Sequence, residues 1–171
     1  MIVSIPTQPD WILSLASDRA TLALAGGKGA NLARLAQAGL PVPDGFVITT
    51  LAYQAFVDAN GLGGQIFRAL PQAQLAPGGQ PVAVGDAAPA ASLAEYEEAA
   101  AHIRSLFGQG RMPADLADQI LAAYARLGRP AVAVRSSATA EDLPEMSFAG
   151  QQDTYLNVVS DDALLRAVID C

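Results

Sequence analysis

One lysine near the start of the chain stands among glycines, in the run Gly26-Gly27-Lys28-Gly29. It is the only lysine of the sequence and the other basic residues are arginines, which indicates a need for a compact ammonium group here. Glycines allow a phosphate to approach the backbone, and a helix expected to begin near Ala30 would add the partial positive charge of its N-terminus. The run is not a Walker A loop, because no Ser or Thr follows the lysine. It predicts either an anion site or a tight turn with a solvated lysine.

A second cation, Arg135, ends the apolar run Val132-Ala133-Val134, which reads as a strand too apolar to face solvent. An arginine on such a strand needs a partner, because burying an unpaired charge is costly. A nearby carboxylate, from Glu141, Asp142 or Asp153, is one possible partner. A ligand phosphate is the other, and the residues alone leave both interpretations open.

The loop after this strand carries the hydroxyl residues Ser136, Ser137 and Thr139. Such side chains either cap local backbone groups or contact phosphate oxygens, and the sequence does not choose between these roles. The acids of the loop, which include Glu145, are not assigned to magnesium, because loop acids are more often solvated or act as caps. His102 lies within an expected helix without ligand-spaced neighbours and is read as structural. No catalytic residue and no metal ligand is therefore assigned.

The overall composition limits the class of protein. Hydrophobic residues make up 51% of the 171 positions and charged residues 16%, which fits a folded globular protein. The net charge of −7 argues against a nucleic-acid partner, since such proteins need a basic face. The single cysteine, Cys171, excludes an internal disulfide. Without a signal-like or membrane-spanning segment, we expect a cytoplasmic protein that does not contact a membrane.

The elements that must position the two cations follow from hydrophobic periodicity and capping residues. Residues 1–24 read as irregular, and the Pro-, Gly- and Ala-rich stretch at 71–90 as a linker or surface excursion. Thr50, a capping box from Ser92 to Glu95, and Ser160 are expected to start helices. The last helix reaches the end of the sequence in mid-pattern, so we expect a truncated chain. Helices are expected over 30–36, 50–61, 92–107, 113–128 and from 160 onward, and strands over 46–49, 131–136 and 152–158.

Two separated blocks of the sequence resemble one family, the N-terminal ATP-grasp domain shared by phosphoenolpyruvate synthase, pyruvate phosphate dikinase and rifampicin phosphotransferase. The first block runs from Gly26-Gly27-Lys28-Gly29-Ala30-Asn31-Leu32 through Gly39-Leu40-Pro41-Val42-Pro43-Asp44-Gly45-Phe46-Val47-Ile48-Thr49-Thr50. The second runs from Arg135-Ser-Ser-Ala-Thr-Ala-Glu-Asp-Leu-Pro144 to Asn157. Together they anchor almost the whole chain in the expected order. The residues Gly29-Ala30-Asn31 and Asp153 lean toward the rifampicin phosphotransferase kind.

By this resemblance, Lys28 and Arg135 correspond to the lysine and arginine that hold the phosphates of ATP. The loop between Arg135 and Gly150 corresponds to the phosphate-covering loop, with Ser136, Ser137, Thr139 and Gly150 as candidate ATP contacts. In the family, ATP is cleaved to AMP and phosphate, and the β-phosphate passes through a histidine on a separate swivelling domain. The acceptor is pyruvate or the hydroxyl of a rifamycin. The second ATP-grasp lobe and the ligands of Mg²⁺ are expected outside this chain.

The resulting fold prediction is α/β (α+β), an incomplete ATP-grasp lobe with a small mixed sheet and helices packed against it. All three expected strands would share that sheet, and Phe46, Ile48, Tyr53 and Phe56 would lie in the core. Whether the chain alone is an enzyme stays open. The alternatives are a non-catalytic nucleotide-binding or regulatory module without the second lobe, and a structural domain whose loops only resemble the motif.

Overall fold

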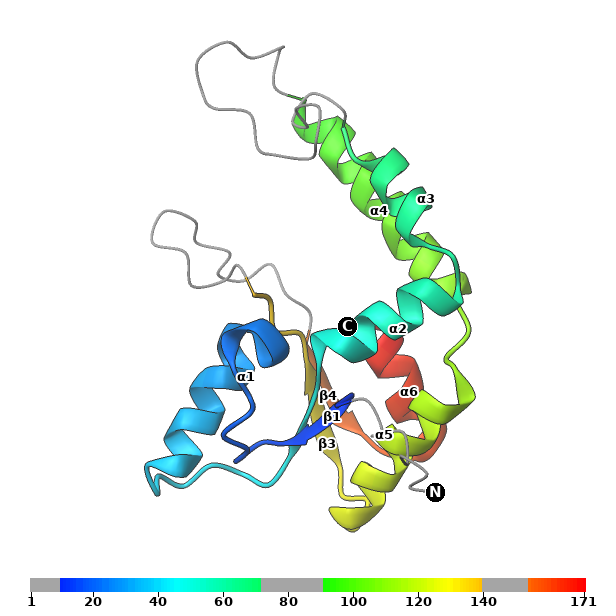
Figure 1. Ribbon diagram of the computed structural model, residues 1–171. Coiled ribbons are helices and arrows are strands. Elements are labelled where there is room, and N and C mark those ends of the chain that lie inside the picture. Colours follow the sequence, from blue (N-terminus) through cyan, green and yellow to red (C-terminus); the bar gives the residue numbers. More distant parts are fainter. Residues whose placement is uncertain (1–9, 72–90, 140–153) are drawn as a thin grey trace, which may run out of the picture. The chain divides into compact units, whose positions relative to one another are not determined.

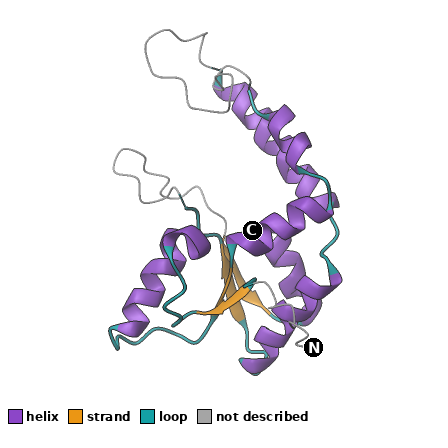
Figure 2. Cartoon of the chain, viewed as in Figure 1, coloured by secondary structure: helices purple, strands orange, loops and turns teal. Residues whose placement is uncertain are grey.

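The computed structural model describes residues 10–71, 91–139 and 154–171 (Figures 1 and 2). Helices and two small antiparallel sheets make up this part of the chain, so the predicted mixed α/β class is confirmed and is consistent with an incomplete ATP-grasp-like lobe. In chain order the elements are β1 (Ile12–Ser14), α1 (Leu22–Gln37), β2 (Phe46–Ile48), α2 (Thr50–Ala59), α3 (Gly63–Ala69), α4 (Leu93–Gln109), α5 (Ala114–Arg126), β3 (Val132–Arg135), β4 (Thr154–Val158) and α6 (Asp161–Asp170).

The chain divides into two compact units. The first is discontinuous in sequence and combines Met1–Phe56 with Met112–Ile169 and the final Cys171. The second contains Val57–Arg111 and Asp170. The chain leaves the first unit after Phe56 and returns to it at Met112. Lys28 and Arg135, the candidate cations, therefore both belong to the first unit.

The first sheet pairs β1 with β2, in the register Ile12 to Ile48 and Ser14 to Phe46. The expectation that residues 1–24 are irregular is therefore wrong for β1. The expectation that all strands share one sheet is also wrong, because among the described strands β2 pairs with β1, and β3 pairs with β4. A strand of three residues shows too little alternation to be recognised without its partner.

Threonines fix the chain where β2 passes into α2. The hydroxyl of Thr49, whose exposure is only 1%, donates a hydrogen bond of 2.7 Å to the carbonyl of Asp10. The hydroxyl of Thr50 donates one of 2.9 Å to the carbonyl of Ala23. We had expected Thr50 to cap this helix, but it is the first helical residue. Its side chain joins α2 to α1.

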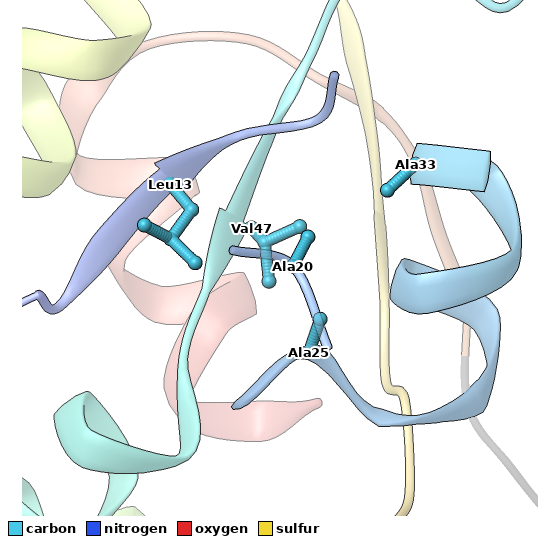
Figure 3. Close-up of a cluster of buried hydrophobic side chains, with 5 residues drawn as sticks. All are labelled: Leu13, Ala20, Ala25, Ala33 and Val47. Atoms are coloured by element: carbon cyan, nitrogen blue, oxygen red, sulfur yellow. The ribbon is translucent and has the colours of Figure 1, made fainter. Parts of the chain in front are cut away.

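Small side chains allow α1 to lie close to the first sheet. A Cβ on Gly29 would lie 2.9 Å from the Cβ of Ala25 and 3.6 Å from Val47, so the helix approaches β2 at a position without a side chain. A cluster of buried apolar side chains holds α1 against β2. Figure 3 shows its buried members: Leu13, Ala20, Ala25, Ala33 and Val47.

Helix α5 also belongs to the first unit, where it contacts β1. Its buried residues Leu116, Ile120, Ala123 and Tyr124 repeat at helical spacing and form one apolar face. The buried hydroxyl of Tyr124 donates a hydrogen bond of 2.7 Å to the carbonyl of Pro130, which fixes the turn between α5 and β3. Burial and a satisfied hydroxyl together hold the start of the second sheet in place.

The second sheet is the β3–β4 pair, with a register shift between Val132 and Val134. Arg129 lies near the end of this sheet that is farther from Arg135. Its guanidinium donates to both carboxylate oxygens of Asp161, at 2.9 and 3.1 Å. This bidentate pair joins the turn between α5 and β3 to the first turn of α6. The hydroxyl of Ser160 accepts from the N–H of Ala163, so the predicted cap of α6 is confirmed.

The second unit contains α3 and α4, which contact each other. The side-chain amide of Asn60 donates to the carbonyl of Arg111 and accepts from its N–H, at 3.0 and 2.8 Å, so the two ends of the unit are joined. The predicted capping box of Ser92 and Glu95 is present. Of the expected core residues, Phe56 is buried but Tyr53 is 54% exposed, because it projects from the solvent side of α2.

Three points concern the rest of the described chain and its helices. The helix α3 was not predicted, since its short sequence carries two glycines. Most of the 71–90 stretch lies outside the described residues. In the described residues no helix has both the length and the apolar character needed to cross a membrane.

The Arg129–Asp161 pair predicts a pH-dependent contribution to stability. The hydrogen bond from Arg129 lowers the pKa of Asp161 below its usual 3.8. A carboxyl whose pKa is lower in the folded state stabilises the fold when ionised, so its contribution is complete above the unfolded pKa and is lost as the pH falls through the folded one. Asp161→Asn should therefore reduce the free energy of unfolding at neutral pH, and the difference from wild type should vanish in acid. Urea denaturation from pH 7 to about 2 measures this.

Asp162→Asn is the matched control, because Asp162 shares the first turn of α6 and its helix-dipole contribution. If both variants lose the same stability at every pH, the pair with Arg129 contributes nothing specific and the prediction is wrong.

Candidate functional site

The glycine run of the sequence is a kink inside α1. At Gly26 the backbone has φ 65° and ψ 178°, a conformation that is essentially confined to glycine. A new helical segment begins after this residue, at Gly27, so Lys28 lies in its first turn. We had expected the helix to start near Ala30, and it starts three residues earlier because the kink resets the helical backbone at Gly26.

The kink is in direct contact with the loop that follows Arg135. The N–H of Gly27 donates to the carbonyl of Ala138 at 2.9 Å, and the N–H of Gly29 donates to the hydroxyl of Ser137 at 3.1 Å. A Cβ on Gly26 would lie 2.4 Å from the carbonyl oxygen of Ser137, which is closer than real Cβ atoms come. We call this contact between residues 26–29 and 137–138 the clasp. It joins segments 108 residues apart.

The clasp brings together the two backbone segments that carry the candidate cations. Lys28 lies between the two bonded amides of the clasp and is half-buried. Arg135 is two residues before Ser137 and is exposed. The joint placement of both side chains on one phosphate stays a prediction.

The exposure of Arg135 corrects the interpretation of its strand. The burial of β3 alternates, with Val132 and Val134 half-buried and Ala133 and Arg135 exposed. The small side chain of Ala133 made the exposed face look apolar in the sequence. Arg135 therefore does not need a buried partner, and its charge is available on the exposed face of the β3–β4 pair.

The adjacent serines after Arg135 differ in their surroundings. The hydroxyl of Ser137 accepts from the N–H of Gly29, so it caps backbone, one of the two roles that the sequence allowed. The proton of this hydroxyl can still be donated. The hydroxyl oxygen of Ser136 is buried and has no hydrogen-bond partner among the residues that the structure describes. Thr139 is exposed. Gly150 and the acids Glu141, Asp142, Glu145 and Asp153 lie outside the described residues.

Thr154, which was not predicted as a site residue, lies directly opposite Arg135 in the β3–β4 register. Opposed residues of an antiparallel pair project from the same face of the sheet, and both of these are exposed. A residue with a hydroxyl group thus shares the exposed face of this strand pair with Arg135. The only signal in the sequence was the pair of strand-like runs around the loop, and the register of such runs depends on the loop between them.

Two further points concern the other candidate groups. His102 is exposed on α4, which belongs to the second unit. No group of three or more His, Cys, Asp or Glu side chains that could hold a metal occurs in residues 10–71, 91–139 and 154–171.

The clasp predicts that Gly26→Ala is far more damaging than a comparable change elsewhere. Gly39→Ala is the matched control, because Gly39 also has a positive φ of 75° but an added Cβ there meets nothing within 4 Å. The control should cost about 1–2 kcal/mol from the backbone conformation alone. Gly26→Ala adds the collision with Ser137, so it should cost several kcal/mol or prevent folding, as measured by chemical denaturation and circular dichroism. Equal losses in the two variants would show that the contact with Ser137 is absent.

Comparison with known proteins places this geometry in a family. Residues 22–171 match the family described as "Pyruvate phosphate dikinase, AMP/ATP-binding domain". The chain is 43% identical over 164 residues to the phosphoenolpyruvate synthase of Aeropyrum pernix, covering 92% of the chain and 18% of that protein. It is 44% identical over 154 residues to a probable phosphoenolpyruvate synthase of Methanocaldococcus jannaschii, covering 86% and 12%. It is 43% identical over 156 residues to a rifampicin phosphotransferase of a Streptomyces species, covering 90% and 16%.

The match includes both sides of the clasp and nearly the whole described sequence. The chain spans less than a fifth of the length of each of these three relatives, so the comparison concerns one part of those proteins. On this match, the chain belongs to the pyruvate phosphate dikinase AMP/ATP-binding domain family.

Proposed function

We propose that the chain binds the phosphates of ATP as the first part of a longer phosphotransferase. The observation that carries this proposal is the clasp, which joins the segment of Lys28 to the segment of Arg135. Two cations on adjoining segments of a protein with net charge −7 provide a local positive field for a polyphosphate. The family match supports ATP as the nucleotide.

The two cations have different chemical roles in this proposal. Lys28 supplies a compact ammonium group from the first turn of a helix, and Arg135 supplies a planar guanidinium that can hold two phosphate oxygens. The hydroxyls of Ser136, Thr139 and Thr154 and the backbone at Gly150 are proposed as additional neutral contacts. The unpartnered Ser136 hydroxyl and the placement of Thr154 opposite Arg135 support this assignment.

We propose that the longer protein cleaves ATP to AMP and phosphate and transfers the β-phosphate through a histidine on a separate swivelling domain. The final acceptor is pyruvate or the hydroxyl of a rifamycin. Relatives of both kinds match at 43% identity, so this comparison does not favour one acceptor. The residues of this chain would bind and orient the phosphates, and electrostatic stabilisation would supply much of the rate.

Several partners are required that this chain does not provide in its described residues. A second lobe must close the ATP site, and the swivelling domain must bring its histidine to the phosphate. Mg²⁺ would offset phosphate charge in such a site. Its ligands are proposed to lie outside this chain, and no step is assigned to it here. A cytoplasmic location is proposed with the same reaction, since the cytoplasm supplies ATP.

Removal of both cations tests the proposal. In the full-length protein, Lys28→Ala and Arg135→Ala should each weaken ATP binding by about tenfold to 150-fold, since a hydrogen bond to a charged group contributes roughly 1.5–3 kcal/mol. The double variant should weaken ATP binding more than either single variant. Isothermal titration calorimetry with ATP and magnesium measures the dissociation constant. Full retention of ATP affinity in the double variant would show that the site is elsewhere.

The matched control removes two other arginines of the same unit. Arg34 lies in the last turn of α1, where it donates to Asn31, and Arg166 is exposed on α6. The double variant of these positions changes the net charge by the same two units and should leave ATP affinity within about twofold of wild type. An equal loss in the control would mean that net charge, and not a local site, determines binding.

A further inference from the structure

The helical segment that begins at Gly27 has no capping side chain of its own. The first N–H groups of a helix need acceptors. The residue before this segment is Gly26, which has no side chain to supply one. Ser137 provides the missing group: its hydroxyl accepts from the N–H of Gly29, as a serine cap does within one helix. The carbonyl of Ala138 satisfies the N–H of Gly27. The acceptors that cap this helical segment thus come from the loop that follows Arg135.

We propose that Ser137 is a positioning residue that sets the placement of Lys28 for ATP, and that it is not itself a phosphate ligand. This inference rests on the proposed function and refines it. The acceptor function of the Ser137 hydroxyl is directed at the Gly29 amide, one residue beyond Lys28. When that bond is present, the first helical turn and its lysine have one fixed position relative to the strand that ends in Arg135.

The geometry around Gly26 favours positioning over direct contact. A Cβ on Gly26 would lie 2.5 Å from the Ser137 hydroxyl oxygen and 2.4 Å from its carbonyl oxygen, so Ser137 lies directly against the kink. The neighbouring hydroxyl of Ser136 is buried and has no hydrogen bond to any described residue. The two serines therefore differ, because only Ser137 joins the two segments.

The expected effect is limited by the strength of a single cap. A serine cap shifts the equilibrium between a held and a released helix start by about 2- to 30-fold. If only the held arrangement binds ATP well, Ser137→Ala weakens binding by no more than this factor. The bond from Gly27 to Ala138 remains, so the segments do not separate completely.

The test measures the dissociation constant of ATP with magnesium for Ser137→Ala and Ser137→Thr in the full-length protein, each with and without Lys28→Ala. Ser137→Ala should weaken binding by about 2- to 30-fold, and Ser137→Thr should restore most of it because threonine also offers a capping hydroxyl. In the Lys28→Ala background the same change should have little further effect. Unchanged affinity, or an equal factor in both backgrounds, would overturn the positioning role.

Ser160→Ala is the matched control for general loss of stability. Ser160 caps α6 in the same unit through a bond of 3.3 Å to the N–H of Ala163, and it has no part in the clasp. This variant should lower the melting temperature and leave ATP affinity unchanged. If it weakens ATP binding as much as Ser137→Ala does, the effect of Ser137 is destabilisation and the inference is wrong.

A second measurement separates this inference from the proposed function. In the ¹⁵N-labelled chain without ATP, Ser137→Ala should accelerate hydrogen exchange of the Gly29 amide by about 2- to 30-fold, and Ser136→Ala should not change it. An unchanged Gly29 amide overturns the inference whatever happens to ATP. If the amide responds but Lys28→Ala leaves ATP affinity intact, the proposed function fails, and positioning for ATP fails with it.

Discussion

The contact between the kink of α1 and the loop after β3 is the constraint on which the rest of the first unit depends. A helix start without a local cap, at a glycine without space for a Cβ, must find its acceptors in another segment. The acceptors are the hydroxyl of Ser137 and the carbonyl of Ala138. The chain completes Val57–Arg111 before it returns to provide them, so the two halves of the first unit have to be joined by this contact and by burial.

Charge distribution in the second sheet follows from the same arrangement. Arg129, before β3, is paired with Asp161 at the start of α6 and stabilises that end of the hairpin. Arg135, at the other end of β3, is exposed beside Thr154. One arginine is thus paired within the fold and the other is exposed, and the distinction comes from their positions at opposite ends of the strand. The chain belongs to an AMP/ATP-binding domain family. That match supports our proposal that Arg135 contacts a nucleotide phosphate.

Local features of the fold could be predicted because their causes are local. The capping box at Ser92 and the cap at Ser160 were correct, since capping depends on residues within one turn of each other. Pairing of β1 with β2, the exposure of Arg135 and the opposition of Thr154 were missed, because each depends on contacts between distant segments. For the site, the sequence identified the two cations as a hypothesis. It did not show that their segments touch, because nothing in the glycine run indicates that its helix is capped from 108 residues away.

The most direct test of this account is a nuclear Overhauser measurement on the ¹⁵N,¹³C-labelled chain without any ligand. The clasp places the amide protons of Gly27 and Gly29 next to Ala138 and Ser137. The account predicts cross-peaks from the Gly29 amide proton to the Ser137 β-protons and from the Gly27 amide proton to the protons of Ala138. A well-dispersed spectrum in which both amides are assigned and neither shows a cross-peak to the 137–138 segment would contradict it.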